Sequence, residues 1–357
     1  MTNPGTHIAG AWLLALAAAT GCAADDGSDG NVGTDPPGDR AMREPAAPVA
    51  LEGSSHAAYE ATLDRLYVAV GPVLHQVQLP DGEPADFFAA EGPIVALDVS
   101  GQGVVLLSEL DEARGRLTRI AHGGNVELEL EIAMTSPGAG FAADPVFRRV
   151  GAETVVIVNG LGNPGAQTIV VNLSSKEIES SDSAVYAFLY QDPGIGVRDG
   201  RLFVPSAYPG EVIEVGVAAD RGLHEIRRVN VNEDWLHDVA MLGENRALVA
   251  GHLAGIGVVE LVDTPGFDGA PYTPLSDVLW AYSFVGEDHA YSASNASVVC
   301  IDTGDLGTWT LDVPGFDAPE PGSQNATAPV GERAPGRVLV HQPGAGIVEV
   351  DCGAARP

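Results

Sequence analysis

The chain has 357 residues, of which 45% are hydrophobic, and this share is enough for a globular core and excludes disorder throughout. Its 49 acidic residues against 18 basic ones give a formal net charge of -31, which repels nucleic-acid phosphates and excludes DNA or RNA binding. The 44 glycines and 25 prolines punctuate short apolar runs, which predicts an all-β protein of many short strands. The acidic surface is typical of an exported protein that stays soluble and monomeric.

The chain starts with an apolar segment, residues 8–19, that ends in small residues. This segment is too short to span a bilayer as a helix and has the pattern of a cleavable export signal over residues 1–21. No Lys or Arg precedes it, although such signals normally start with basic residues.

The residues that follow, Ala19-Thr20-Gly21-Cys22, resemble the lipobox of bacterial lipoproteins. The resemblance implies that Cys22 is lipidated, becomes the mature N-terminus and anchors the protein in the cell envelope, and Ala23 favours the outer membrane. A plain signal peptide in which the cysteine is coincidental remains the alternative.

Residues 22–47 are rich in Asp, Gly and Pro and poor in apolar residues, which predicts a flexible tether. The DDGSDGN stretch within it lacks the alternating aspartates and the closing glutamate of a calcium loop. No metal or cofactor is expected there or elsewhere.

The remaining residues, 48–353, contain seven copies of one pattern: a turn, a strand, a short loop and a second β-branched strand. The first strands of these copies begin near Leu66, Val104, Val155, Leu202, Ala247, Ala290 and Val338. Their mean spacing of about 45 residues suits a blade of four short strands. We therefore predict a seven-bladed β-propeller with four-stranded antiparallel blades.

The other two strands of each blade can be assigned from the segments around each copy. Short apolar segments before six of the turns are the expected inner strands: residues 94–100, 144–150, 194–197, 236–242, 278–285 and 326–330. The clearest outer strand is 126–132, whose alternation places Val126, Leu128, Leu130 and Ile132 on one face. The last copy has no outer strand of its own, so residues 48–53 are expected to supply it and close the ring.

The stretches DRLYVAV, DGRLFVP and NRALVAG, each followed by a loop and a run such as VIEV, resemble the YVTN-type repeats of bacterial seven-bladed propellers. The resemblance covers roughly residues 48–352 and supports the fold. It says little about function, because propellers host binding, scaffolding, lyase, hydrolase and redox roles.

No metal-binding, P-loop, nucleophile-elbow or haem-attachment spacing is present. In a propeller, the loops that enter inner strands and those that join second to third strands converge around the central channel, so polar residues there are candidates. The candidate ligand-binding residues are Tyr208, Trp235, His237, His252, Trp280 and His341.

Three functions are compared. The first is a non-catalytic binding or scaffold module, held to a membrane by its lipid, for an envelope protein, peptide or glycan. The alternative is a propeller-type lyase or hydrolase in which His237, with Asp238 or Asp144, acts as general base. A redox accessory role is a third, for which the sequence shows no cofactor ligand. Cys300 and Cys352 end similar runs and are either a disulfide or two buried thiols.

Overall fold

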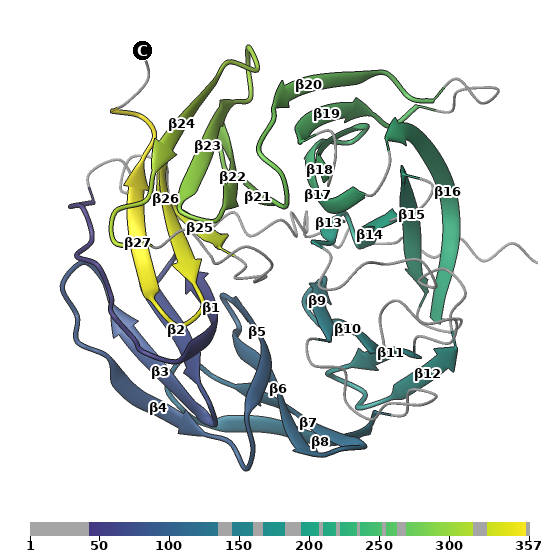
Figure 1. Cartoon of the computed structure of the whole chain (residues 1–357). Helices are drawn as coiled ribbons and strands as arrows, with labels where there is room; N and C mark the ends of the chain where they lie inside the picture. Colours follow the sequence, from purple (N-terminus) through teal and green to yellow (C-terminus); the bar gives the residue numbers. More distant parts are fainter. Residues whose placement is uncertain are drawn as a thin grey trace, which may run out of the picture.

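The computed structural model describes residues 43–134, 145–159, 167–182, 194–206, 210–218, 222–233, 236–251, 255–262, 269–316 and 327–354. Within these ranges the chain forms 27 β-strands and no helix, so no described segment is an apolar helix of membrane-spanning length. The strands form seven antiparallel sheets arranged as blades around a ring (Figure 1). The expected fold, an all-β seven-bladed propeller, is confirmed.

Each blade follows the chain from its inner strand to its outer strand. Blade 1 contains β1 (Ser54–Glu60), β2 (Arg65–Val70), β3 (Val73–Gln78) and β4 (Ala85–Ala89). Blade 2 contains β5 (Ile94–Ser100), β6 (Gly103–Asp111), β7 (Arg114–Ile120) and β8 (Val126–Ala133). Blade 3 contains β9 (Val146–Val150), β10 (Thr154–Asn159), β11 (Gln167–Asn172) and β12 (Ile178–Asp182). Blade 4 contains β13 (Gly196–Arg198), β14 (Arg201–Ser206), β15 (Gly210–Ala218) and β16 (Gly222–Glu233).

Blades 5 to 7 complete the ring. Blade 5 contains β17 (Leu236–Gly243), β18 (Arg246–Gly251), β19 (Ile256–Glu260) and β20 (Tyr272–Ser276). Blade 6 contains β21 (Tyr282–Val285), β22 (His289–Ser294), β23 (Ser297–Asp302) and β24 (Thr308–Asp312). Blade 7 contains β25 (Ala328–Ala334), β26 (Arg337–Gln342) and β27 (Gly346–Asp351).

The second strand of every blade begins one residue before the position expected from the repeat. The sequence pattern did not assign the inner strand of blade 1, which is β1, Ser54–Glu60. In the outer strand β8, Leu128 and Ile132 are buried as expected, whereas Val126 is 45% exposed. Val126 is the first residue of the strand, at the rim of the blade, where the neighbouring sheet covers less of it.

The turns between first and second strands and between third and fourth strands lie on one face of the ring, called here the lower face. The remaining loops lie on the opposite, upper face. The hydrophobic core is divided among the seams between adjacent blades: the described residues form seven apolar clusters, each joining two neighbours. One cluster joins Leu107 of blade 2 to Ile157 of blade 3, and another joins Val68 of blade 1 to Leu339 of blade 7. A blade alone would expose both of its apolar faces, so the ring is the cooperative unit.

The N-terminal segment closes the ring, as expected, but with a shorter contact than a full strand. Val49 forms an antiparallel bridge with Ile347 of β27 through two backbone hydrogen bonds of 2.9 Å. Pro48 has no N–H to extend the ladder on one side. On the other side the chain turns at once into β1, with the Ser54 amide bonded to the carbonyl of Leu51 at 3.1 Å.

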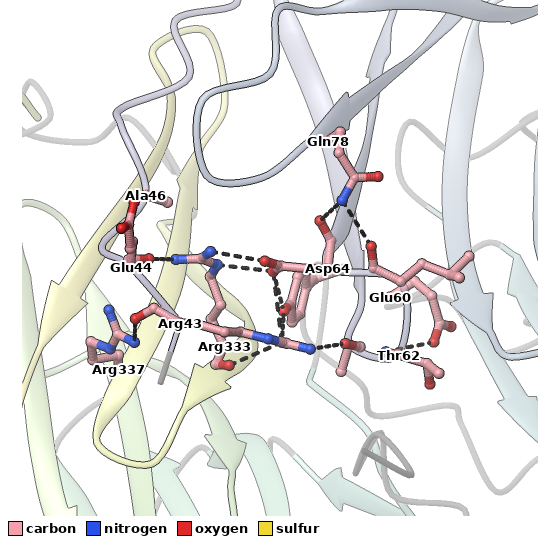
Figure 2. Close-up of polar contacts among 12 residues, drawn as sticks. Arg43, Glu44, Ala46, Glu60, Thr62, Asp64, Gln78, Arg333 and Arg337 are labelled. Atoms are coloured by element: carbon pink, nitrogen blue, oxygen red, sulfur yellow. Dashed lines mark hydrogen bonds and ion pairs between the residues drawn. The ribbon is translucent and has the colours of Figure 1, made fainter. Parts of the chain in front are cut away.

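The first described residue, Arg43, already contacts the propeller, before the expected start of the domain at residue 48. Arg43 donates to the Tyr59 hydroxyl and the Ala61 carbonyl, both at 2.6 Å, on the lower side of the seam between blades 7 and 1 (Figure 2). Arg333 lies beside it and is 1% exposed. The polar cluster that Arg43, Tyr59, Asp64, Arg333 and Glu349 form is called here the closure cluster.

Cys300 of β23 and Cys352, just after β27, are joined in a disulfide with Cα atoms 5.9 Å apart. The bond links blade 6 to blade 7. The Trp309 indole donates to the carbonyl of Cys352 at 3.1 Å, across the same seam. Of the two alternatives left open by the sequence, the structure has the disulfide.

Candidate binding site at the upper face

His237 lies at the upper end of β17, the inner strand of blade 5, and is only 5% exposed. Its ring makes edge contacts with Trp280 at 5.3 Å and with Tyr282 at 4.7 Å between centroids. Both partners belong to the segment that leads into β21 of blade 6. The imidazole therefore fills the seam between blades 5 and 6, and we call His237, Trp280 and Tyr282 the aromatic cluster.

Asp238 is the next residue along β17 and lies where the register between β17 and β18 shifts. It is 3% exposed and its carboxyl presses against Gly194, just before β13 of blade 4. A Cβ atom on Gly194 would come within 1.5 Å of the Asp238 Oδ1 atom, so a larger residue there would displace the Asp238 carboxyl. The Gly194 amide and carbonyl also bond to the backbone of His237 and Val239 at 3.0 and 3.1 Å, which ties blade 4 to blade 5.

Burial raises the pKa of Asp238 to about 7, against the opposing effects of a hydrogen bond from Ser283 and the charge of Arg148. Among the described residues, the Oδ2 atom of this carboxyl has no hydrogen-bond partner. Arg148 is fixed on the inner strand of blade 3 by bonds to the carbonyls of Ile195 and Phe147.

Trp280 adopts a left-handed backbone conformation, with φ of +57°. This region is disfavoured for a residue with a bulky side chain, and such strain concentrates at binding and catalytic sites. The preceding residue, Leu279, is 39% exposed, and its carbonyl accepts a hydrogen bond from the Ser294 hydroxyl at 2.8 Å. The strained turn thus presents an apolar side chain to solvent beside the aromatic cluster.

His341, expected in a loop, instead lies within β26 and is 4% exposed. Its Nε2 atom is 3.1 Å from the hydroxyl oxygen of Ser54, in the seam between blades 7 and 1. Burial, and next the nearby His56, lower the pKa of His341 to about 3, so the ring is neutral. This placement makes His341 a packing residue rather than a surface ligand contact.

The other candidates from the sequence cannot be placed. Asp144, Tyr208, Trp235, His252 and Cys22 lie outside the described residues. Of the predicted site, the structure brings His237 and Trp280 into contact, whereas the Asp238 carboxyl lies against Gly194 of blade 4.

The sequence pattern missed Tyr282, Ser283, Arg148 and Gly194. Trp280 lies in a left-handed turn and Tyr282 is the first residue of β21, so strand alternation does not link the two residues. The contacts of Arg148 and Gly194 cross between blades, and nothing in the linear pattern indicates them.

Two chemical roles can be compared with this geometry. A general base must reach a proton on a bound substrate, and a ring that is 5% exposed between two aromatic side chains is poorly placed for that task. Within the described ranges, no group of three or more His, Cys, Asp or Glu side chains is arranged to hold a metal ion. The arrangement suits recognition of a partner by apolar and aromatic contact.

No family model and no curated protein matches the chain. Solved structures do match the chain. The chain has the fold of solved β-propellers. It is similar to the WD40 domain of Neurospora crassa Pan2, with 10% identity, a TM-score of 0.54 and coverage of 84% of this chain and 89% of that one. It is likewise similar to the β-propeller domain of Myceliophteria thermophila Cps50 (Swd1), with 11% identity, a TM-score of 0.54 and coverage of 87% and 99%. At this identity the likeness concerns the fold of the propeller alone.

Proposed function

We propose that the protein is an exported, lipid-anchored β-propeller of the YVTN-repeat type that binds a protein, peptide or glycan of the cell envelope as a non-catalytic module. The observation that carries the binding role is the strained Trp280 turn, which displays Leu279 next to the aromatic cluster on the upper face. Aromatic residues with exposed apolar neighbours are enriched at the centres of interfaces. No metal or cofactor takes part in this role.

The lipid anchor is proposed from the sequence around Cys22. Arg43, the first residue that the structure describes, contacts the carbonyl of Ala61 in a lower-face turn, and this contact supports a tether on that side of the ring. A tether leaving the lower face keeps the upper face free for a partner. We place the protein at the outer membrane as a monomer.

The binding role is tested by capture from an extract of the protein's own envelope, followed by affinity measurement with the captured molecule. We expect Leu279→Ala and Trp280→Gly to weaken binding about 10-fold or more, because apolar contacts at an interface centre dominate affinity. The matched control is Ile226→Ala, since Ile226 is 46% exposed but lies on the outer strand of blade 4. Equal binding by all variants would refute the upper-face site.

The anchor has a separate test. Cys22→Ser should move the protein from the membrane fraction to the soluble fraction and abolish incorporation of labelled fatty acid. A variant that stays in the membrane fraction would contradict lipidation at Cys22 without affecting the binding proposal.

A further inference from the structure

A second feature lies on the lower face, away from the aromatic cluster. A cavity of about 210 Å³ opens between the first turns of blades 4 and 5. Its lining residues come from β13, β14, β16 and the turn after β17: Arg198, Asp199, Arg201, Phe203, Arg227, Glu244 and Asn245. Three of the chain's 18 basic residues therefore surround one small cavity in a protein whose formal charge is -31.

Two of these arginines are placed opposite each other by a tight hairpin. Arg198 and Arg201 are direct partners in the register between β13 and β14. The two residues between them, Asp199 and Gly200, have φ of +50° and +71°, as a two-residue hairpin turn requires. Like charges directly opposite on neighbouring strands destabilise a sheet, so this pair costs folding energy unless an anion lies between or beside the two groups.

The carboxylates of the protein accept hydrogen bonds from only some of the guanidinium N–H groups around the cavity. Glu214, 3% exposed, accepts a bond of 2.6 Å from Arg201 and a second bond from Arg227. Arg227 also donates to the carbonyl of Leu261 and to the Asn245 side chain, and so it is largely occupied.

Arg198 has fewer hydrogen-bond acceptors for its guanidinium group than Arg201 and Arg227 have. Its Nε atom lies 3.5 Å from the Asp199 carboxylate, and within the described part of the chain this buried nitrogen makes no hydrogen bond. The Arg198 side chain is 37% exposed at the cavity. The buried Nε cannot reach a ligand, but Arg198 and Arg201 both line the cavity with side chains that are 37% and 52% exposed, so their terminal N–H groups can meet a ligand there.

We propose that this cavity binds a small oxyanion, a carboxylate or a phosphate group, through Arg198 and Arg201. A guanidinium fork matches two oxygens of either group, and an anion between the two arginines removes their mutual repulsion. The cavity is smaller than the about 300–1,000 Å³ of pockets for larger ligands, so the occupant is a small molecule or the charged end of one.

The rim restricts the charge of the ligand. Asp199 and Glu244 line the same cavity, and they repel a polyanion that would extend past the arginines. The same carboxylates can accept hydrogen bonds from a hydroxyl or amino group of the ligand, and the buried Phe203 gives it an apolar wall.

The test is isothermal titration of the full-length protein with inorganic phosphate and, separately, with malonate, at ionic strength held constant with NaCl. We expect at least one probe to bind with a Kd below about 1 mM. Arg198→Gln should weaken that binding about 10-fold or more, and Arg198→Lys should restore little of it because lysine lacks the planar fork. The probe that binds more tightly identifies phosphate or carboxylate as the ligand group.

Arg228→Gln is the matched control. Arg228 is 38% exposed, lies on β16 of the same blade, pairs with Glu211 and Glu225, and does not line the cavity. This variant removes the same charge and should bind the probe as the unmodified protein does. Absence of binding by both probes, or equal loss in the Arg228 variant, would overturn the proposal. Leu279→Ala should leave probe binding unchanged, so this site and the upper-face site can fail independently.

Discussion

Arg333 donates two hydrogen bonds to the carboxylate of Asp64, at 2.9 and 2.8 Å, across 269 residues of sequence (Figure 2). The pair joins the inner strand of the last blade to the first turn of blade 1. Arg333 also contacts Glu349 at 3.0 Å, so its guanidinium holds two carboxylates at the place where the ring closes. Burial raises the pKa of Asp64, but the Arg333 hydrogen bonds, with Tyr59 and Arg43, outweigh it and leave the pKa below 3.8.

Replacing Arg333 with methionine should lower the free energy of unfolding by about 1–3 kcal/mol, because the buried Glu349 and the half-buried Asp64 each lose one of two arginine partners and keep only the other, Arg337 and Arg43. Urea denaturation followed by fluorescence measures this. The control is Arg114→Met: Arg114 also pairs with two carboxylates, Asp111 and Glu131, but all three side chains are 44–52% exposed. That change should shift the urea midpoint much less than the Arg333 change does, because exposed ion pairs are screened by solvent and contribute little to stability. Equal costs for the two variants would show that closure does not depend on the buried pair.

Reduction of the Cys300–Cys352 disulfide should destabilise the ring. The bond spans 52 residues of sequence, and a loop of that length corresponds to about 4 kcal/mol of stabilisation in the chain-entropy treatment. The measurement compares urea midpoints with and without reductant in a Cys22→Ser background, which leaves the disulfide as the sole cysteine chemistry. An unchanged midpoint after complete reduction would contradict the prediction.

His341 should make the protein less stable in acid. Its pKa is about 3 in the folded chain and 6.5 when exposed, so between these values the unfolded chain binds a proton that the folded chain does not. The free energy of unfolding therefore falls as pH is lowered from 6.5, with a contribution of up to about 1.4 kcal/mol per pH unit. Urea unfolding at several pH values should show a shallower acid loss in His341→Gln.

Asp238 should make the protein less stable as the pH rises, which is the opposite of the effect of His341. Its pKa of about 7 lies above the unperturbed 3.8, so the folded chain binds the extra proton between these values. Its contribution to stability is full below pH 3.8 and is lost as pH rises through 7. Asp238→Asn, which keeps the shape, should flatten this dependence, and the same pH series measures it. A steeper loss on the alkaline side in the variant would refute the raised pKa.

At position 280, substitution by glycine should destabilise the protein no more than substitution by alanine, which reverses the usual order of these two residues. At φ of +57°, alanine carries the strain of a left-handed residue and glycine does not. Trp280→Gly should therefore be at least as stable as Trp280→Ala in urea denaturation, although both lose the ring contact with His237. If the alanine variant is the more stable by about 1 kcal/mol, the backbone of this turn is not strained.

The repeat, the strands and the blade number follow from the sequence alone. Each blade has its own turn residues and its own alternation of apolar side chains, and these are local signals that survive in linear order. The use of the N-terminal segment to close the ring could also be predicted, because the last repeat lacks an outer strand. The sequence pattern predicted the ends of the strands less well. His341 was expected in a loop, whereas the pairing of β26 with β27 extends through this residue.

Only the tertiary structure decided which side chains meet. Arg333 stands in a short GERAPGR stretch that has the composition of an exposed turn, yet it is 1% exposed because blade 1 and the N-terminal segment cover it. His237 faces Trp280 and Tyr282, rather than the ring axis, because the next blade supplies both rings. The alternation of apolar residues determines on which side of a strand a side chain lies. The residue that it contacts there comes from another blade. Which residue that is depends on the twist and stacking of the sheets around the ring.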